Sequence, residues 1–383
     1  MYFDYAAATP VDKKVLTAMS PYFSDQFYNP SSAYSPARQV RADYQAAKHR
    51  IAQVIGAKPA EIIITSGATE SINLALAQCH SGLDPESGVI TTAIEHPAVL
   101  ETARQNGARI LPVDSKGRVD PENLEKYITD DIKIVSIGYA NNELGVVQNL
   151  KAVAEICRQK RLERVESGVA MPLVLHTDAS QAAGLLDINV ARLGVDLMTL
   201  SSGKCYGPKG VGLLYVRAGV VLDPLFNGGG QEAGLRSGTE NVAGVMGFAT
   251  ALEMAEKKRK NEVRRLEGLQ RNLEKYIISD IKNAELHSIS KQKLPNIINF
   301  SVEGLDAERA VFALDQRGVQ VSTGSACAAN KGTRSHVLTA IGLSPAAADG
   351  SLRISLGRGT TKKEIEEFKP ILKEIIDHEQ KLS

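Results

Sequence analysis

The sequence lacks the features that mark several specialised classes of protein. Its 383 residues contain no tryptophan and only four cysteines, and no apolar run approaches the ~18 residues of a membrane span. Cys79, Cys157, Cys205 and Cys327 lie far apart and form no Cys-x-x-Cys pair. This spacing argues against a zinc knuckle, an iron-sulfur cage or a disulfide scaffold, so we expect no metal site.

The chain also lacks an excess of charge of either sign. Lys and Arg number 45 and Asp and Glu number 44, so the formal net charge is +1. Such a balance favours neither nucleic acid nor an anionic membrane as a direct partner. The first residues, Met1 to Tyr5, do not begin a signal peptide, and we therefore expect a cytoplasmic protein.

One run of like charge lies inside a long helical pattern that extends from about residue 240 to residue 277. It consists of Lys257 to Lys260, followed by Arg264 and Arg265. Glu256 and Glu262 are interleaved with these cations. The interleaving favours a solvated helix face over a partner site.

The hydrophobic pattern predicts an α/β protein. From about residue 36 to residue 216, short apolar runs alternate with helical periodicity, as in a domain with a mainly parallel sheet. Residues at spacings of four and three form one helix face, which Gly56 can end. These residues are Val40, Tyr44, Ala47, Ile51 and Val54. Further strands are expected at 61–65, 132–138, 173–176 and 211–216, and further helices at 97–106 and 149–160.

After the long helix, strand and helix signals begin again. Strands are expected at 296–301 and 352–356 and a helix at 307–316, and a closing helix turns Ile365, Phe368, Leu372 and Ile375 inward. At roughly 150 residues per domain, the length indicates two or three domains. We expect a large α/β domain of residues 16–255 and a smaller α+β domain made of residues 1–15 and 256–383.

Two glycine-rich loops fail the tests for common nucleotide motifs. Lys204 follows Gly203, but Cys205 replaces the Ser or Thr that a P-loop uses to hold its metal ion. The stretch from Gly228 to Gly230 does not follow a convincing buried strand, as a dinucleotide fingerprint requires.

Polar residues follow several of the expected strands, where loops converge at the carboxyl edge of a parallel sheet. Thr65 to Glu70 joins a strand to a helix, whose free N–H groups form a phosphate seat together with Thr69. Asp178 leaves another strand, and Lys204 lies among small and turn-forming residues. Singly, these residues are explained as a helix cap, a surface acid and a solvated lysine. Together they provide what pyridoxal 5'-phosphate (PLP) requires: a phosphate anchor, a partner for the pyridinium and an amine for a Schiff base.

With these segments the sequence resembles the cysteine desulfurases of the NifS/IscS type, PLP enzymes of fold type I in the class V aminotransferase family. The resemblance covers nearly the whole chain. The matching segments are 4–10, 29–32, 65–73, 95–96, 141–148, 178–181, 204–210, 236–239, 324–327 and 353–358. It implies a large domain with a mainly parallel central sheet, a smaller α+β domain and a homodimer.

The resemblance implies roles for residues around the cofactor. Lys204 matches the Schiff-base lysine, Asp178 the partner of the pyridine nitrogen, and His96 the imidazole that stacks on the ring and assists proton transfer. Asn142 and Gln181 match the residues near the phenolic oxygen.

Further matching positions concern the phosphate and the substrate. The implied phosphate contacts are Thr69, Ser201 and, across a dimer interface, Thr239, and Ala68 and Gly203 are further implied cofactor-binding positions. Arg353, with Asn29 beside it, is implied to bind the substrate carboxylate, for which a planar guanidinium offers two parallel hydrogen bonds.

Cys327 matches the catalytic cysteine of the family. A lone cysteine is by default a buried, inert thiol, and we keep that interpretation for Cys79 and Cys157. Cys205, next to Lys204, is interpreted as a packing residue that could oxidise. The residues around Cys327, from Ser322 to Thr333, are small, polar and glycine-bearing, which is typical of a loop.

The implied reaction is PLP-dependent removal of sulfur from L-cysteine. It gives L-alanine and a persulfide on Cys327, which passes its sulfur to an acceptor protein of iron-sulfur assembly or of tRNA or DNA thiolation. Selenocysteine lyase, another PLP amino-acid enzyme and a non-catalytic scaffold of the same fold are the alternatives.

Two features depart from the family pattern. The family usually has His where this chain has Gly203, which offers only its backbone to the phosphate. The link between Arg158 and Pro172 is longer than usual, and we interpret residues 159–171 as a surface insertion.

Overall fold

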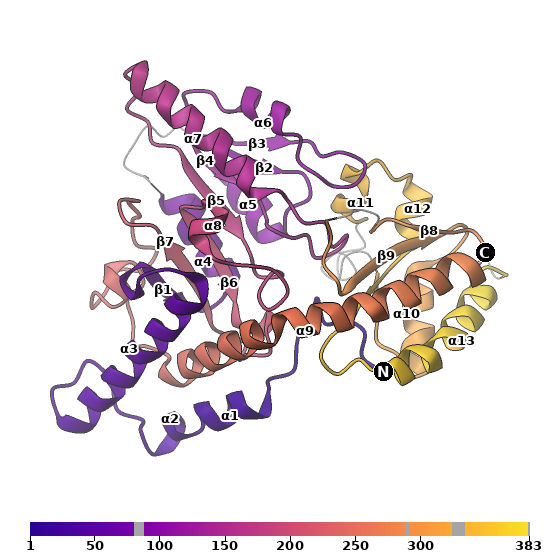
Figure 1. Cartoon of the computed structure of the whole chain (residues 1–383), viewed down its shortest axis with the longest axis horizontal. Coiled ribbons are helices and arrows are strands. Elements are labelled where there is room, and N and C mark those ends of the chain that lie inside the picture. Colours follow the sequence, from indigo (N-terminus) through magenta and orange to yellow (C-terminus); the bar gives the residue numbers. More distant parts are fainter. Residues whose placement is uncertain (80–87, 289–291, 324–333, 382–383) are drawn as a thin grey trace.

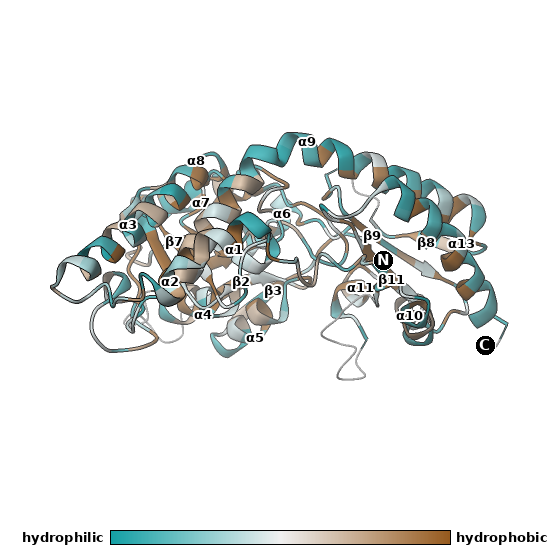
Figure 2. Ribbon diagram, turned by 90° about the horizontal axis from the view of Figure 1, so that it is seen from below, coloured by the Kyte–Doolittle hydropathy of each residue, from teal (hydrophilic) through white to brown (hydrophobic). Residues whose placement is uncertain are grey.

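Two β-sheets lie side by side in the structure, a computed structural model that describes residues 1–79, 88–288, 292–323 and 334–381. The long helix α9 (Val242–Asp280) runs across both sheets (Figure 1). In the view turned by 90°, α9 lies along one side of the molecule, above the two sheets (Figure 2).

Within the described residues, seven strands form the larger sheet in the order β1-β7-β6-β5-β4-β2-β3. They are β1 (Ile62–Thr65), β2 (Gly88–Thr92), β3 (Ala108–Leu111), β4 (Ile132–Ser136), β5 (Val174–Asp178), β6 (Leu197–Ser201) and β7 (Gly212–Val216). Strands β3, β2, β4, β5 and β6 pair in parallel, whereas β7 is antiparallel to both β6 and β1. β1 and β6 therefore run in the same direction, and the expected α/β class with a mainly parallel sheet is confirmed.

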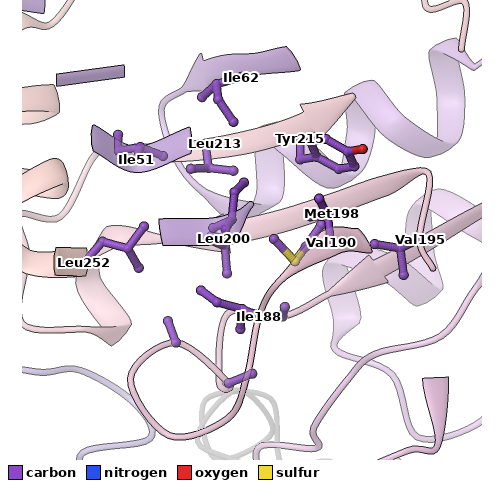
Figure 3. Close-up of a cluster of buried hydrophobic side chains, with 14 of the residues drawn as sticks. Ile51, Ile62, Ile188, Val190, Val195, Met198, Leu200, Leu213, Tyr215 and Leu252 are labelled. Atoms are coloured by element: carbon purple, nitrogen blue, oxygen red, sulfur yellow. The ribbon is translucent and has the colours of Figure 1, made fainter. Parts of the chain in front are cut away.

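Helices cover both faces of this sheet, which explains why its strands are continuous apolar runs. Successive side chains of a strand point to opposite faces. Ile62 and Ile64 accordingly pack in the cluster that includes α3 and α9, and Ile63 packs in the cluster that includes α4. Figure 3 shows part of the first cluster, where Ile51 and Leu252 from two helices meet the strands.

The helices of this part of the chain are α1 (Lys13–Met19), α2 (Pro21–Ser24), α3 (Ser35–Ile55), α4 (Ala68–Gln78), α5 (Pro97–Gln105), α6 (Pro121–Tyr127), α7 (Leu150–Glu166) and α8 (Val190–Leu193), with short 3-10 turns η1 (Pro59–Glu61), η2 (Ser202–Lys204) and η3 (Glu232–Gly234). Helices α3 and α5 match the expected positions closely, whereas α7 extends beyond its expected end. Gly56 ends α3 with φ 71°, a left-handed conformation that favours glycine.

The smaller sheet is antiparallel, in the order β10-β11-β9-β8. Its elements are β8 (Ala284–Leu286), β9 (Ile297–Val302), α10 (Ala307–Gln316), β10 (Ser322–Thr323), α11 (His336–Ala340), α12 (Pro345–Asp349), β11 (Ser351–Ser355) and α13 (Lys362–Glu379). Leu352 and Ile354 point into the cluster that contains α10 and α13. Arg353, between them on β11, therefore points to the opposite face, toward the larger sheet.

The helix expected at 149–160 is longer than predicted, while most of residues 159–171 are exposed, as expected for a surface segment. Helix α7 continues to Glu166 instead of ending near residue 160. Arg164, 4% exposed, donates hydrogen bonds to the carbonyl oxygens of Thr129, Ile132 and Met171, and Arg161 pairs with Asp196. Arginines rather than apolar residues form the inward side of the C-terminal end of α7. Hydrophobic periodicity therefore did not predict that the helix continues.

The two sheets have separate hydrophobic clusters, and α9 contributes to both. Its residues from Val242 to Ala255 pack with the larger sheet, and those from Leu266 to Ile277 pack with the smaller one. The domain limits at 15/16 and 255/256 stay a prediction. In the described part of the chain, no helix is both long and apolar enough to span a membrane.

Candidate active site

A cavity of about 490 Å³ opens at the carboxyl edge of the larger sheet, where it faces the smaller sheet. The loops that follow β1, β2, β4, β5 and β6 all reach it, because these strands run in the same direction. Ten of the residues selected from the sequence line it: Ala68, Thr69, His96, Asn142, Asp178, Gln181, Ser201, Gly203, Lys204 and Arg353.

The N-terminus of α4 forms one end of the cavity, with Gly67, Ala68 and Thr69 in its wall. No side chain caps this helix start among the described residues. The first N–H groups of a helix have no partner within the helix and carry a partial positive charge. This end of the cavity is therefore suited to an anion such as a phosphate group.

Asp178 ends β5 and is half-buried in the cavity wall. Its Oδ1 accepts a hydrogen bond from the backbone N–H of Ser180 at 2.9 Å, which fixes the carboxylate. Two residues before it, His176 lies fully buried between the hydroxyls of Ser136 (2.8 Å) and Thr199 (3.0 Å). Burial lowers the pKa of His176 to about 4, although the Asp178 carboxylate opposes the shift, so Asp178 has a neutral imidazole behind it.

Lys204 ends η2, directly after β6, and is half-buried rather than solvated. Its Nζ donates to the carbonyl oxygens of Ala6 and Ala7, each at 2.7 Å. The Ala6 carbonyl also accepts from Nε2 of Gln181 at 3.1 Å. The N-terminal segment thus holds the Lys204 ammonium at the cavity through two backbone carbonyl oxygens, which are uncharged acceptors.

His96 caps the N-terminus of α5 and faces the cavity. Its Nδ1 accepts from the backbone N–H of Ala98 at 3.1 Å, so the neutral ring carries its proton on Nε2. Loss of solvent lowers the pKa of His96, the Asp178 carboxylate opposes this, and the Lys204 ammonium and His336 lower it further. The ring is therefore set up as a neutral N–H donor.

Arg353 enters the cavity from the smaller sheet, with 1% of its surface exposed. It pairs with Oδ1 of Asp4 at 2.8 Å and donates to the carbonyl oxygen of Asn142 at 3.1 Å. Its Nε is buried and has no hydrogen-bond partner among the described residues. A buried guanidinium N–H without a partner is costly, and a carboxylate ligand would satisfy it.

Two buried carboxyl groups, which the sequence reasoning assigned no role, also line the cavity. Oε1 of Glu95 accepts from the Thr92 hydroxyl (2.7 Å) and from the N–H of Gly138 (3.0 Å), and Glu143 accepts from the Ser335 hydroxyl (2.6 Å). Burial raises the pKa of each carboxyl to about 7. Both stand beside residues that the resemblance selected, His96 and Asn142, but adjacency alone does not predict a charged residue that turns inward.

Gly203 leaves space in the wall of the cavity. A Cβ at this position would lie 3.5 Å from Cγ of Lys209, an ordinary van der Waals distance. Lys209 itself lines the cavity and donates to the carbonyl oxygen of Thr9 at 2.8 Å. Like Glu95 and Glu143, it was not singled out from the sequence.

Three selected residues are not among those that line the cavity. Asn29 and Thr239 are exposed, and Oδ1 of Asn29 accepts from the N–H of Ser31. Cys327 lies outside the described residues. The other three cysteines are buried and free, and burial raises the pKa of each thiol to about 12, in agreement with their expected inert or packing roles. No cluster of potential metal ligands occurs in the part of the chain that the structure describes.

Residues 1–368 of the chain match the aminotransferase class-V family. The chain belongs to this family. Among similar class-V members, a cysteine desulfurase IscS of Dictyoglomus turgidum is 40% identical over 383 residues, which cover 98% of this chain and 94% of that protein. The resemblance to cysteine desulfurases of the NifS/IscS type is thereby confirmed.

Solved structures of similar proteins share this architecture. A NifS-like protein has 34% sequence identity and a TM-score of 0.90, with 99% of each chain covered. SspA in complex with cysteine has 36% identity and a TM-score of 0.79 over 93% of this chain and 98% of that chain. These likenesses confirm the fold type I architecture that the sequence predicts.

Proposed function

We propose that the protein is a PLP-dependent cysteine desulfurase, which converts L-cysteine to L-alanine and carries the released sulfur as a persulfide on Cys327. The similarity to IscS and NifS-like proteins over the full chain supports this activity. The observation that carries the proposal is the meeting of an anion-binding helix end, Asp178, Lys204 and Arg353 in one cavity.

The residues of the cavity fit PLP. The uncapped end of α4, with Thr69 and Ser201, suits the phosphate, and Asp178 suits a protonated ring nitrogen. Lys204 would hold the carbonyl carbon covalently, and His96 would stack on the ring, as the resemblance implies. When bound, PLP supplies an electron sink for charge that develops on the substrate Cα.

The substrate is held by its carboxylate. Arg353 already has one N–H toward Asp4 and one toward the Asn142 carbonyl, and its unpartnered Nε remains for an anion. Because the guanidinium is fixed from both sides, it orients the amino acid with its Cα toward Lys204. Lys204 would then remove the Cα proton with its amine, and His96 would donate from Nε2.

The sulfur transfer is assigned to Cys327 from the sequence resemblance. Its thiolate would attack the sulfur of the substrate, so that an S–S bond forms and the C–S bond breaks. The electron pair of the broken bond returns to the carbon skeleton, which takes up protons and leaves as alanine.

We further propose a cytoplasmic homodimer in which Thr239 reaches the phosphate end of the partner's cavity. Large apolar side chains exposed near the N-terminus support an interface: Leu16 (52% exposed), Phe23 (69%), Phe27 (66%) and Tyr34 (52%). The sulfur would pass to an acceptor protein of iron-sulfur assembly or of tRNA or DNA thiolation.

The test is to incubate the purified protein with PLP and L-cysteine, quantify alanine and locate the persulfide by mass spectrometry. The wild type should release alanine and carry an added sulfur on Cys327. Cys327→Ser should lose both but keep the cofactor absorbance, and Lys204→Ala should lose alanine release together with the covalently held cofactor. A yellow wild-type protein that makes neither product would exclude L-cysteine as the substrate.

A further inference from the structure

The outer face of α9 carries a line of cations that the proposed reaction does not use. Positions 257, 261, 264, 268, 271 and 275 follow each other at spacings of four and three residues, and all six are exposed. They are Lys257, Asn261, Arg264, Gly268, Arg271 and Lys275, and we call them the basic seam. At 1.5 Å per residue the seam is about 27 Å long.

The opposite face of α9 explains why the seam points outward. Leu266, Leu269 and Leu273 are buried in the hydrophobic cluster of the smaller sheet. At about 100° per residue these leucines lie on the other side of the helix from Arg264 and Arg271. The seam therefore faces away from the protein, along the outer side of α9 seen in Figure 2.

Most acidic residues interleaved with the basic run pair with cations beside the seam, whereas Glu267, three residues after Arg264 and four before Arg271, makes no ion pair in the described part of the chain. Glu256 pairs with Arg259 at 2.8 Å and Glu262 with Arg265 at 2.7 Å, both to the side of it. Glu274 pairs with Lys293 at 2.5 Å. Among the described residues, no ion pair reaches Lys257, Arg264, Arg271, Lys275 or the neighbouring Lys260.

This arrangement places several like charges next to each other along the helix. Like charges three or four residues apart repel each other, as in the pairs Lys257–Lys260, Lys260–Arg264 and Arg271–Lys275. The seam packs against nothing in the fold, so the fold does not require these charges. The expected solvated, mixed-charge surface is confirmed for Arg259 and Arg265, which pair with Glu256 and Glu262, and the seam lies beside these pairs.

We propose that the basic seam docks an acidic α-helix of a partner protein. A strict alternation of four and three residues keeps a seam aligned with a second helix that crosses at about 20°. Gly268 has no side chain, and the space around its Cβ position is open, with no atom within 4 Å. A partner helix can therefore approach α9 closely at the middle of the seam. The same heptad series, 257, 264 and 271, continues to Ile278, which is 53% exposed and gives the seam an apolar end.

The same observations argue against nucleic acid as the occupant. The seam carries no aromatic side chain on which a base can stack, and the whole chain has a net charge of only +1. A helix with carboxylates at heptad spacing matches both the period and the charge of the seam.

The experiment measures binding of a fluorescent helical peptide of about 24 residues with glutamates at alternating four- and three-residue spacing. A peptide of the same composition, with its glutamates spread around the helix, is the first control. The protein is the PLP-loaded full chain without L-cysteine, so the result does not depend on the desulfurase reaction. We expect the glutamate-seam peptide to bind at least about tenfold more tightly than the spread peptide, because only it aligns its charges with the seam.

Charge reversal then locates the site. Lys257→Glu, Arg264→Glu and Arg271→Glu together should weaken the glutamate-seam peptide about tenfold or more, and a lysine-seam peptide should bind this variant instead. The matched control reverses three exposed lysines elsewhere, Lys116, Lys126 and Lys151, which changes the net charge equally and should leave binding within about twofold. Alanine release should be the same in all three proteins, which also shows that they are folded.

Three results would overturn the proposal. The first is equal binding of the two glutamate peptides, and the second is an equal loss in the matched control, both of which indicate unspecific attraction. The third is a single-stranded or duplex DNA of similar length that binds more tightly than the peptide and is lost on charge reversal at the seam. That result would assign the seam to nucleic acid.

Discussion

At the scale of single residues, Glu143 makes the stability of the fold depend on pH. The residue is 2% exposed, and burial raises the pKa of its carboxyl group to about 7, although the Ser335 hydroxyl and the Arg353 guanidinium oppose the shift. The folded protein therefore binds this proton more tightly than the unfolded chain does. The stabilisation is complete below the unfolded pKa and is lost as the pH rises through about 7.

Glu143→Gln should remove this loss, because the amide keeps an acceptor for Ser335 but does not ionise. Compared with the wild type, its free energy of unfolding should rise by up to about 3 kcal/mol between pH 5 and pH 8. Urea unfolding at several pH values measures the difference. Glu122→Gln, at an exposed position of α6, is the control and should follow the wild type, and a Glu143→Gln profile parallel to the wild type would contradict the prediction.

Gly203 gives a second prediction at this scale. Gly203→His should lower the dissociation constant of PLP about tenfold, because the added ring brings a hydrogen-bond donor to the phosphate end of the cavity. The backbone accepts a Cβ at this position, with Lys209 at van der Waals distance from it. Titration of the apoprotein, followed by absorbance, measures the change. Gly203→Ala adds the Cβ without the imidazole ring, and it should leave the affinity for PLP nearly unchanged.

At the scale of elements, Glu232 ties three parts of the larger domain together. From η3 its carboxylate accepts from Lys48 Nζ (2.8 Å) and Tyr44 Oη (2.6 Å) on α3 and from the backbone N–H of Ile64 (2.7 Å) on the edge strand β1. The Lys48 and Glu232 side chains are 9% and 5% exposed. Glu232→Ala should therefore cost about 3–5 kcal/mol, since it leaves a buried ammonium unpaired.

Thermal or urea unfolding measures this cost, and the exposed pair Arg104–Glu101 provides the comparison. These side chains are 56% and 66% exposed, so Glu101→Gln should change the stability by less than about 1 kcal/mol. Similar losses in both variants would mean that solvent screens the Glu232 carboxylate as well.

Elements with a regular apolar period were predictable from the sequence. The helix expected at 307–316 is α10, and all four residues expected to point inward from the closing helix are buried in α13. The end of α7 was not predictable, because Arg161 and Arg164 fill the positions where apolar residues would have continued the pattern. Hydrophobic periodicity cannot detect a helix face held by guanidinium groups that bond to carbonyl oxygens.

At the scale of the whole molecule, the topology explains which site residues could be found. Thr69, Asp178 and Lys204 follow strands that run in one direction, so a parallel sheet brings them to one edge whatever the details of packing. Arg353 comes from the smaller sheet, and its pairing with Asp4 depends on how the two sheets meet. Hydrophobic periodicity carries no information on that contact. Arg353 was therefore selected from the family resemblance alone, and the role of Asp4 was not predicted.

Thr239 leads to a prediction that only the assembled molecule can meet. It is exposed and not among the residues that line the cavity of its own chain, and we propose that it completes the partner's phosphate site. Thr239→Val should then raise the dissociation constant of PLP about tenfold, by loss of a hydrogen bond to a charged group. Lys204→Ala should abolish alanine release. A mixed dimer of these two variants contains one site with both an intact Lys204 and an intact Thr239.

Differently tagged subunits allow this mixed dimer to be purified and assayed at limiting PLP. Its alanine release should approach half that of the wild type and exceed that of the Thr239→Val dimer. A mixed dimer of Lys204→Ala with Asp178→Asn is the matched control. Both residues act in the cavity of their own subunit, so each of the two sites carries one damaging change. We expect no gain in alanine release for this dimer. Equal behaviour of the two mixtures would mean that Thr239 does not act across the interface, and each cavity would then have to hold the phosphate with its own α4 terminus and Ser201.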